Sequence, residues 1–168
     1  MPEDSPRYLL DSSVLFSLDD GNVLDILWEL HLSWCTTDLI LAEWETVDTD
    51  SLIRSGLIAI SLSDDDIAEI FRISPQYRKI KPSDLSLFLH ASDHRDCIVI
   101  TGDRRLRALC EGAGIPVHGV LWILDLIHDR DLLSRPDLIQ ALQAMIEKGN
   151  YLPEPDCQER VDRWESDE

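Results

Sequence analysis

The chain has 168 residues, 44% of them hydrophobic, and carries 33 acidic against 15 basic residues, for a formal net charge of -18. This length suits one domain with a substantial core, and a second independent domain is not expected. The negative charge argues against a general nucleic-acid coat protein, but it does not exclude a nuclease, because metal ions offset carboxylates at a site.

The N-terminus and the cysteines indicate the compartment. MPEDSPRY is acidic where a signal peptide would be basic, and no apolar run approaches the roughly 20 residues that a bilayer requires. The cysteines are widely spaced and form no CxxC pair, so neither a zinc site nor a disulfide framework is expected. They are Cys35, Cys97, Cys110 and Cys157. We therefore expect a cytoplasmic protein.

The hydrophobic pattern predicts strands that alternate with helices. Short apolar runs that end at turn signals predict strands over residues 7–11, 33–37, 58–63, 97–101 and 115–119. Apolar residues at helical spacing predict helices within 13–31 (two), 38–56, 63–75, 84–94, 104–112, 120–129, 137–149 and 158–164. This alternation implies a three-layer α/β/α fold with a central parallel sheet of four to five strands.

Cap and stop signals set the expected helix ends. Ser63 is followed three residues later by Asp, an approximate capping box, and its helix should stop near Pro75. Ser83 is the expected cap of the helix over residues 84–94, and Pro82 prevents a helix from running straight through.

Two carboxylates fall at the carboxyl ends of predicted strands. Asp11 closes the first strand, and Asp103 follows the 97–101 strand directly. Open parallel sheets bind ligands at this edge, where strand ends and helix N-termini converge. Each Asp is also a plausible N-cap for the helix after it. Glu43 and Asp84 have similar alternatives: an exposed helix position for the first, and a favourable charge at a helix start for the second.

Four segments taken together resemble a known family. LLDSSVL, LAEWE, SDLSLFLHAS and VITGDRRL look like the successive motifs of PIN domains, metal-dependent nucleases that include VapC-like toxins of toxin-antitoxin systems. The resemblance runs from about Tyr8 to Ile123, and GIPVHGVLWILDLI looks like the stretch after the last site motif in toxin-like members. It implies a single PIN-like domain over 1–168, with a core at about 7–123 and a helical C-terminal extension over 124–168 whose role is left open.

Carried over by position, the resemblance makes an acidic quartet of Asp11, Glu43, Asp84 and Asp103. Such a quartet is expected to bind Mg2+ or Mn2+, with Asp11 and Asp103 as direct ligands and the other two holding a second ion or orienting the attacking water. Gly102 departs from the family, which often has Asn there, but Gly also permits a tight turn.

Several polar residues are candidates for substrate binding, although capping or a solvated helix face also explains them. They are Ser12, Thr101, Arg104, Arg105, Arg78 and Lys79. Trp44 is expected in the core, or else stacked on a base. Leu24, Leu27 and Trp28 are core residues or part of a dimer interface.

The expected function is that of a metal-dependent endoribonuclease, the toxin of a toxin-antitoxin pair, with RNA, an antitoxin and a second copy of the chain as partners. The alternative is a catalytically inactive PIN-like protein that acts as a binding module. A haloacid-dehalogenase-like phosphatase fits poorly, because it needs an Asp where Ser13 stands. A dinucleotide-binding fold is excluded because no GxGxxG follows the first strand.

Overall fold

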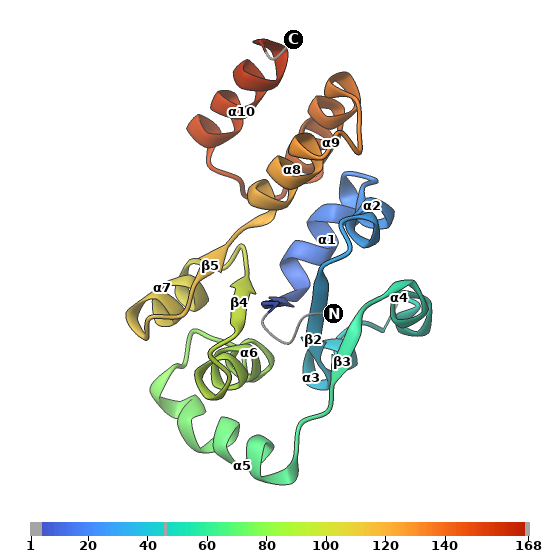
Figure 1. The fold of residues 1–168 in the computed structure, drawn as a ribbon. Helices are drawn as coiled ribbons and strands as arrows, with labels where there is room; N and C mark the ends of the chain where they lie inside the picture. The colour runs from blue at the N-terminus through green and yellow to red at the C-terminus, as the bar shows by residue number, and fades with distance from the viewer. Residues whose placement is uncertain (1–4, 46, 167–168) are drawn as a thin grey trace.

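A computed structural model describes residues 5–45 and 47–166 of the chain. Its centre is a parallel sheet in the order β3-β2-β1-β4-β5 (Figure 1). The strands are β1 (Arg7–Leu10), β2 (Ser33–Thr37), β3 (Ile58–Ile60), β4 (Cys97–Ile100) and β5 (Val117–His118). Each lies within a segment that the sequence pattern predicts, so the expected parallel sheet of four to five strands is confirmed.

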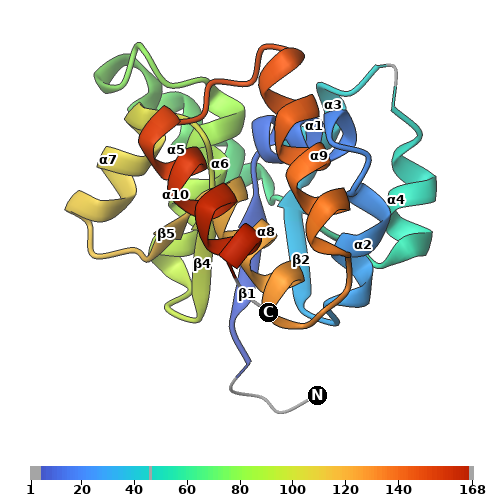
Figure 2. The same ribbon diagram turned by 90° about the horizontal axis from the view of Figure 1, so that it is seen from above.

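Helices cover both faces of the sheet, which confirms the three-layer α/β/α arrangement (Figures 1 and 2). On one face α3 and α6 pack on the strands, with α5 and α7 beside α6. On the other, α1 packs against α2, α8 and α9, and α10 packs against α9. The bounds are α1 (Ser12–Asp20), α2 (Leu24–Glu29), α3 (Asp38–Ala42), α4 (Thr49–Ser55), α5 (Asp64–Ile73), the 3-10 helix η1 (Ser74–Gln76), α6 (Pro82–Asp93), α7 (Arg104–Gly112), α8 (Val120–Asp129), α9 (Arg135–Glu147) and α10 (Glu154–Ser166).

The two central strands form the middle of the core. Leu9 and Leu10 of β1 are fully buried, as are Val99 and Ile100 of β4, because helices cover both of their faces. Burying each such aliphatic side chain contributes about 1.5 to 3 kcal/mol. This rigid pair of strands fixes the positions of the residues that follow each of them, and those residues include Asp11 and Asp103.

Two predicted helix limits are confirmed. Ser63 and Asp66 form a complete capping box at the start of α5, and α5 ends at Ile73, two residues before Pro75.

The cysteines are free and buried, as the absence of a disulfide pattern predicts. No helix in the described part of the chain is long and apolar enough to cross a bilayer.

The single helix expected over residues 38–56 is wrong, because the structure has α3 and α4 there instead. The chain leaves the helix after Ala42, and the carboxylate of Asp48 accepts a hydrogen bond from the Ser51 amide to cap a new helix. The indole of Trp44 points back to the hydroxyl of Ser12, at 3.0 Å. Capping and this contact outweigh continuous helical propensity.

One other expectation needs correction, and burial decides between the two alternatives for Leu27. Ser83 is not the cap of α6, because the helix already begins at Pro82 with Lys81 as the capping residue, and Ser83 lies buried inside the first turn. Proline suits that first helical position, since it has no amide hydrogen to leave unpaired. Of the residues considered for the core or a dimer interface, Leu27 is fully buried and is a core residue, and Leu24 and Trp28 are partly buried against the same core.

Candidate functional site

Asp11 and Asp103 are brought together by the pairing of β1 with β4. The amide of Asp11 donates to the carbonyl of Ile100 at 3.1 Å, which continues the strand pairing by one residue. The hydroxyl of Thr101 donates to Oδ2 of Asp11 and accepts a hydrogen bond of 3.0 Å from the amide of Asp103. One buried threonine therefore links the carboxylate of Asp11 to the main chain of Asp103 at the carboxyl edge of the sheet.

Asp11 is buried, with 2% of its surface exposed. Its Oδ1 accepts hydrogen bonds from the Ser13 hydroxyl at 2.7 Å and the Val14 amide at 3.0 Å, so the residue caps α1. Burial raises the pKa of Asp11 most strongly and the charge of Asp103 adds to the rise, whereas the hydrogen bonds from Thr101, Ser13 and Val14 oppose it.

Asp103 uses only one of its two oxygens within the fold. Oδ1 accepts from the amides of Arg105 at 2.8 Å and Leu106 at 2.9 Å, which caps α7. Within residues 5–45 and 47–166, no hydrogen bond reaches Oδ2. Asp103 therefore has both the capping role and a free oxygen atom for a ligand.

Glu43 and Asp84 approach from the helices on one face of the sheet. Glu43 ends α3, and its Oε1 accepts a hydrogen bond of 2.6 Å from the hydroxyl of Ser83 in α6. Asp84 follows Ser83 directly. The pKa of Asp84 is raised to about 7, mainly by burial and additionally by the charges of Asp11, Asp103 and Glu43, against the opposing charge of Lys81.

The four carboxylates thus lie close enough to interact electrostatically. Among the described side chains, no three His, Cys, Asp or Glu residues stand in position to hold a metal ion together. Mg2+ commonly takes only one or two carboxylates directly and keeps several waters. A donor set of carboxylate oxygens with at least one oxygen unused therefore fits such an ion chemically.

The expected substrate-binding residues divide into two groups. The hydroxyls of Ser12 and Thr101 already form hydrogen bonds within the protein. Ser12 accepts from the indole of Trp44, and Thr101 links Asp11 to Asp103. Arg104 lies at the start of α7, where its Nη2 donates to the hydroxyl of Tyr151 at 2.7 Å. Arg105, Arg78 and Lys79 are exposed, the last two in the turn before α6.

The structure decides between the two alternatives for Trp44 and gives Ser83 a role that the sequence did not indicate. Trp44 is 6% exposed and packs with Phe16 at 5.9 Å between ring centroids, so it is a core residue and is not available to stack on a base. Ser83 positions Glu43, a role that no local pattern indicates because 40 residues separate the two.

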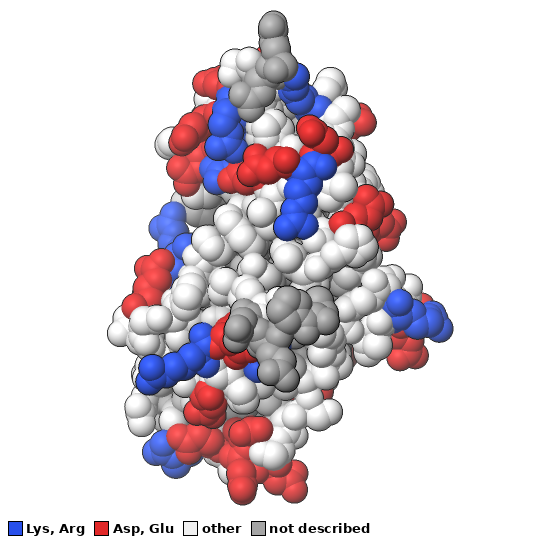
Figure 3. All heavy atoms as spheres, viewed as in Figure 1, with Lys and Arg blue, Asp and Glu red and all other residues white. Residues whose placement is uncertain are grey.

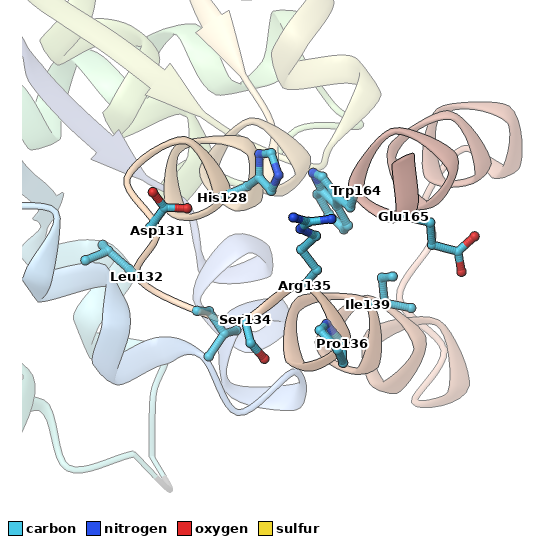
Figure 4. A pocket seen from close by; sticks show the side chains of 10 residues that line it. His128, Asp131, Leu132, Ser134, Arg135, Pro136, Ile139, Trp164 and Glu165 are labelled. Carbon is cyan, nitrogen blue, oxygen red and sulfur yellow. The ribbon is translucent and has the colours of Figure 1, made fainter. Parts of the chain in front are cut away.

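A pocket of about 910 Å³ lies between α8, α9 and α10, away from the carboxylates (Figure 4). Figure 4 shows Arg135 between Trp164 and Pro136, with His128 on the facing helix. None of the four carboxylates lines this pocket. This pocket is therefore separate from the candidate site at the carboxyl edge of the sheet.

A comparison with protein-family models identifies the family of this chain. A family model described as a PIN domain matches residues 7–166. The crystal structure of PAE2754 from Pyrobaculum aerophilum is 19% identical to this chain, with 74% of this chain and 96% of that chain covered and a TM-score of 0.45. No curated protein matches the chain. Because the family match spans the sheet, every helix from α1 to α10 and the carboxylates at the strand ends, this chain belongs to the PIN-domain family.

Proposed function

We propose that this protein is a metal-dependent endoribonuclease that hydrolyses RNA phosphodiester bonds and acts as the toxin of a toxin-antitoxin pair. One observation carries the proposal. In a chain of the PIN-domain family, four carboxylates from different elements lie close enough for the charges of Asp11, Asp103 and Glu43 to raise the pKa of the fourth, Asp84. Unpaired carboxylates brought this close are costly unless a cation offsets their charge.

The proposed roles follow from the chemistry of the donors. The proposed direct ligands are Asp11 and Asp103. Within the described residues, Oδ2 of Asp103 accepts no hydrogen bond from the protein. Glu43 and Asp84 bind a second ion or orient the attacking water. When bound, Mg2+ or Mn2+ supplies charge neutralisation at the phosphoryl oxygens, activation of water and help for the leaving oxygen. Ser83 holds the Glu43 carboxylate, and Thr101 holds that of Asp11.

The charge distribution of the surface is compatible with an RNA substrate. Acidic side chains gather over α5 at one end of the molecule (Figure 3), where Asp64, Asp65 and Asp66 form the exposed first turn. This acidic surface is separate from the first turn of α7, where Arg104 and Arg105 stand directly after Asp103. Cations beside the reacting phosphate can offset its charge, while the remote acidic surface is screened by salt.

RNA cleavage by three proteins with Mg2+, Mn2+ or a chelator tests the function. The proteins are the wild type, Asp11→Asn and a control, Asp19→Asn, which removes the same charge from an exposed position of α1. We expect cleavage by the wild type and the control only with metal, and a loss of at least about 100-fold in Asp11→Asn, since a metal contributes several kcal/mol to the transition state. Equal cleavage by Asp11→Asn would remove Asp11 from the site.

The proposed partners are a small antitoxin and a second copy of the chain. Exposed apolar side chains are available for such contacts, among them Phe71, which is 58% exposed on α5. Sedimentation of wild type and Phe71→Glu tests the dimer at this face. We expect a dimer for the wild type and a folded monomer for the variant, while unchanged sedimentation of the variant would exclude this face.

One observation favours a second candidate, a PIN-like binding module without catalytic activity. The oxygens of Asp11 already accept hydrogen bonds from Thr101, Ser13 and Val14, which together satisfy the carboxylate without a metal. The module predicts no cleavage of any RNA by folded wild-type protein and no stabilisation by Mg2+ or Mn2+. Stabilisation by metal that is lost in Asp11→Asn would exclude it.

A further inference from the structure

A second pocket, of about 620 Å³, opens directly beside the carboxylates. It shares Ser13, Thr101 and Gly102 with the carboxyl edge of the sheet, and the hydroxyls of Ser13 and Thr101 both donate to Asp11. Its other walls are α7, the start of α8 and residues 150–160. The volume lies within the range of about 300 to 1,000 Å³ that is typical of small-ligand sites.

The pocket gathers positive charge in a strongly acidic chain. Three of the 15 Lys and Arg residues line it: Arg104, Arg107 and Arg160. Arg160 is committed to Asp125, to which its guanidinium donates at 2.9 to 3.2 Å. Within the described residues, the ion pair of Arg107 is a long one of 3.6 Å with the exposed carboxylate of Glu111, a contact of little strength in water. Arg104 and Arg107 are therefore the cations available to an anionic ligand.

The residue at the start of α8 leaves room for one of these cations. A Cβ built on Gly119 would lie 3.3 Å from Nη2 of Arg107 and 3.6 Å from the carbonyl oxygen of Thr101, so a side chain there would crowd the guanidinium. Among the described residues that line the pocket, one carboxylate, that of Asp156, opposes the positive charge of the arginines. The pocket is thus positively charged on the wall nearest the carboxylate site.

Aromatic rings also line the pocket. Tyr151 is 75% exposed, and the guanidinium carbon of Arg104 lies 5.0 Å from the centre of its ring. His118 and Trp122 are stacked, with 4.3 Å between ring centroids and an angle of 4° between their planes. Cations combined with accessible ring faces are the features with which proteins hold single-stranded nucleic acid, through its phosphates and its unstacked bases.

The C-terminal wall is fixed by specific contacts. The side chain of Asn150 donates to the carboxylate of Asp20 and the carbonyl of Met145, both at 2.8 Å, and accepts from the hydroxyl of Ser17 at 2.7 Å. These bonds fasten the segment before α10 to α1 and α9 and hold Tyr151 at the pocket. The helical extension that the sequence leaves unexplained therefore completes a binding pocket.

We propose that this pocket binds one nucleotide of the RNA strand next to the bond that is cut, with its phosphate on Arg104 and Arg107 and its base stacked on Tyr151. The inference rests on the proposed function for the identity of the strand. It adds a subsite that the four carboxylates do not provide. The subsite selects single-stranded RNA, because a base inside a duplex is stacked between its neighbours and has no free face for Tyr151.

Binding without cleavage tests the pocket independently of catalysis. The probe is a fluorescent single-stranded RNA of six nucleotides and mixed sequence, titrated in chelator with wild type, Arg107→Ala, Tyr151→Ala and Tyr151→Phe. The control is Arg95→Ala, which removes an exposed cation before β4, at the opposite edge of the sheet. Thermal melts show that each variant is folded.

We expect Tyr151→Ala to weaken binding by about 10-fold or more, since base stacking contributes about 1 to 3 kcal/mol, and Tyr151→Phe to bind nearly as well as the wild type. Arg107→Ala is expected to reduce the slope of log affinity against log salt by about 1, and Arg95→Ala to leave it unchanged. Failure of the wild type to bind the RNA, or equal RNA binding by the wild type and all the variants, would overturn the proposed nucleotide pocket.

Cleavage assays with metal separate this inference from the proposed function. If the pocket variants bind less RNA but the wild type cuts none, the proposed nuclease function is wrong and the proposed nucleotide pocket is supported. If the wild type cuts RNA while Tyr151→Ala and Arg107→Ala keep the same KM and the same cut sites, the nuclease remains and the pocket is wrong.

Discussion

The hydroxyl of Ser83 donates a hydrogen bond of 2.6 Å to Oε1 of Glu43 and so joins the start of α6 to the end of α3. Ser83 is buried, whereas Glu43 is exposed. An exposed glutamate ordinarily samples several rotamers, and ordering it has an entropic cost. This hydrogen bond thus restricts Glu43 before any ligand is bound.

Removing this hydroxyl is expected to impair the site more than the fold. We expect Ser83→Ala to lower RNA cleavage several-fold and to weaken stabilisation by Mn2+, while the free energy of unfolding falls by only about 1 kcal/mol, the usual net contribution of one hydrogen bond. Ser92→Ala is the matched control, because Ser92 lies on the same helix and its hydroxyl donates to the carbonyl of Phe88 within that helix.

Cleavage rates, and melting temperatures with and without metal, check this expectation. If both serine variants behave alike in metal binding and in cleavage, the Ser83 contact contributes to stability alone and does not organise Glu43.

Asp84 makes the stability of the metal-free protein depend on pH. Its pKa in the folded chain is about 7, raised from the usual 3.8, so the folded state keeps a proton that the unfolded chain releases. Between about pH 4 and pH 7 the native state binds more protons, and the free energy of unfolding must fall as pH rises through that window. We expect Asp84→Asn to reduce this fall.

Urea unfolding in chelator from pH 5 to pH 8 measures the effect. Asp93→Asn, an exposed residue at the end of α6, removes the same formal charge without changing the carboxylate site. If Asp84→Asn and Asp93→Asn show the same pH dependence, general repulsion in this acidic chain explains the fall, and Asp84 has no special part in it.

The positions of Asp11 and Asp103 are predictable from the sequence because their cause is local. Each follows an apolar run of strand length, and parallel strands end at the same edge of a sheet, so the alternation of strands and helices is enough to place them together. The expected capping alternative is also correct for both residues. A single sequence does not reveal that Thr101 connects them.

The local sequence pattern does not predict contacts between segments that are distant in the chain. Ser83 has the composition of a helix cap, and only the packing of α6 on α3 gives it Glu43 as a partner. The pocket beside the site has the same origin, since Arg107 and Tyr151 are 44 positions apart in the numbering and meet only in the folded chain. The break between α3 and α4 depends likewise on the contact of Trp44 with Ser12.

Substitution at Asp103 separates capping from metal binding. Asn retains an oxygen that accepts from the amides of Arg105 and Leu106, whereas Ala does not. We expect Asp103→Asn to keep the stability of the metal-free protein and Asp103→Ala to lose about 1 kcal/mol. Both are expected to lose stabilisation by Mg2+ or Mn2+, which melting curves with and without metal will measure. Full stabilisation of Asp103→Asn by metal would identify Asp103 as a cap alone.

Asp125 of α8 is expected to hold α10 against the rest of the fold. Its carboxylate accepts from Arg160 at 2.9 Å and from Arg163 at 2.5 Å, and its side chain is only 19% exposed. Because Asp125→Ala leaves two guanidinium groups without their acceptor, we expect a loss of about 1.5 to 3 kcal/mol in the free energy of unfolding. Urea unfolding measures it, with Asp129→Ala, an exposed position of the same helix, expected to cost less than about 0.5 kcal/mol.

The same variant connects the C-terminal helix to the pocket. Arg160 lines the pocket, and the pair with Asp125 keeps its charge occupied. Asp125→Ala frees this cation, so single-stranded RNA should bind at least as tightly as it does to the wild type, although the protein unfolds more easily. Loss of RNA binding by the folded variant would show that the pocket depends on the position of α10 more than on the charge of its arginines.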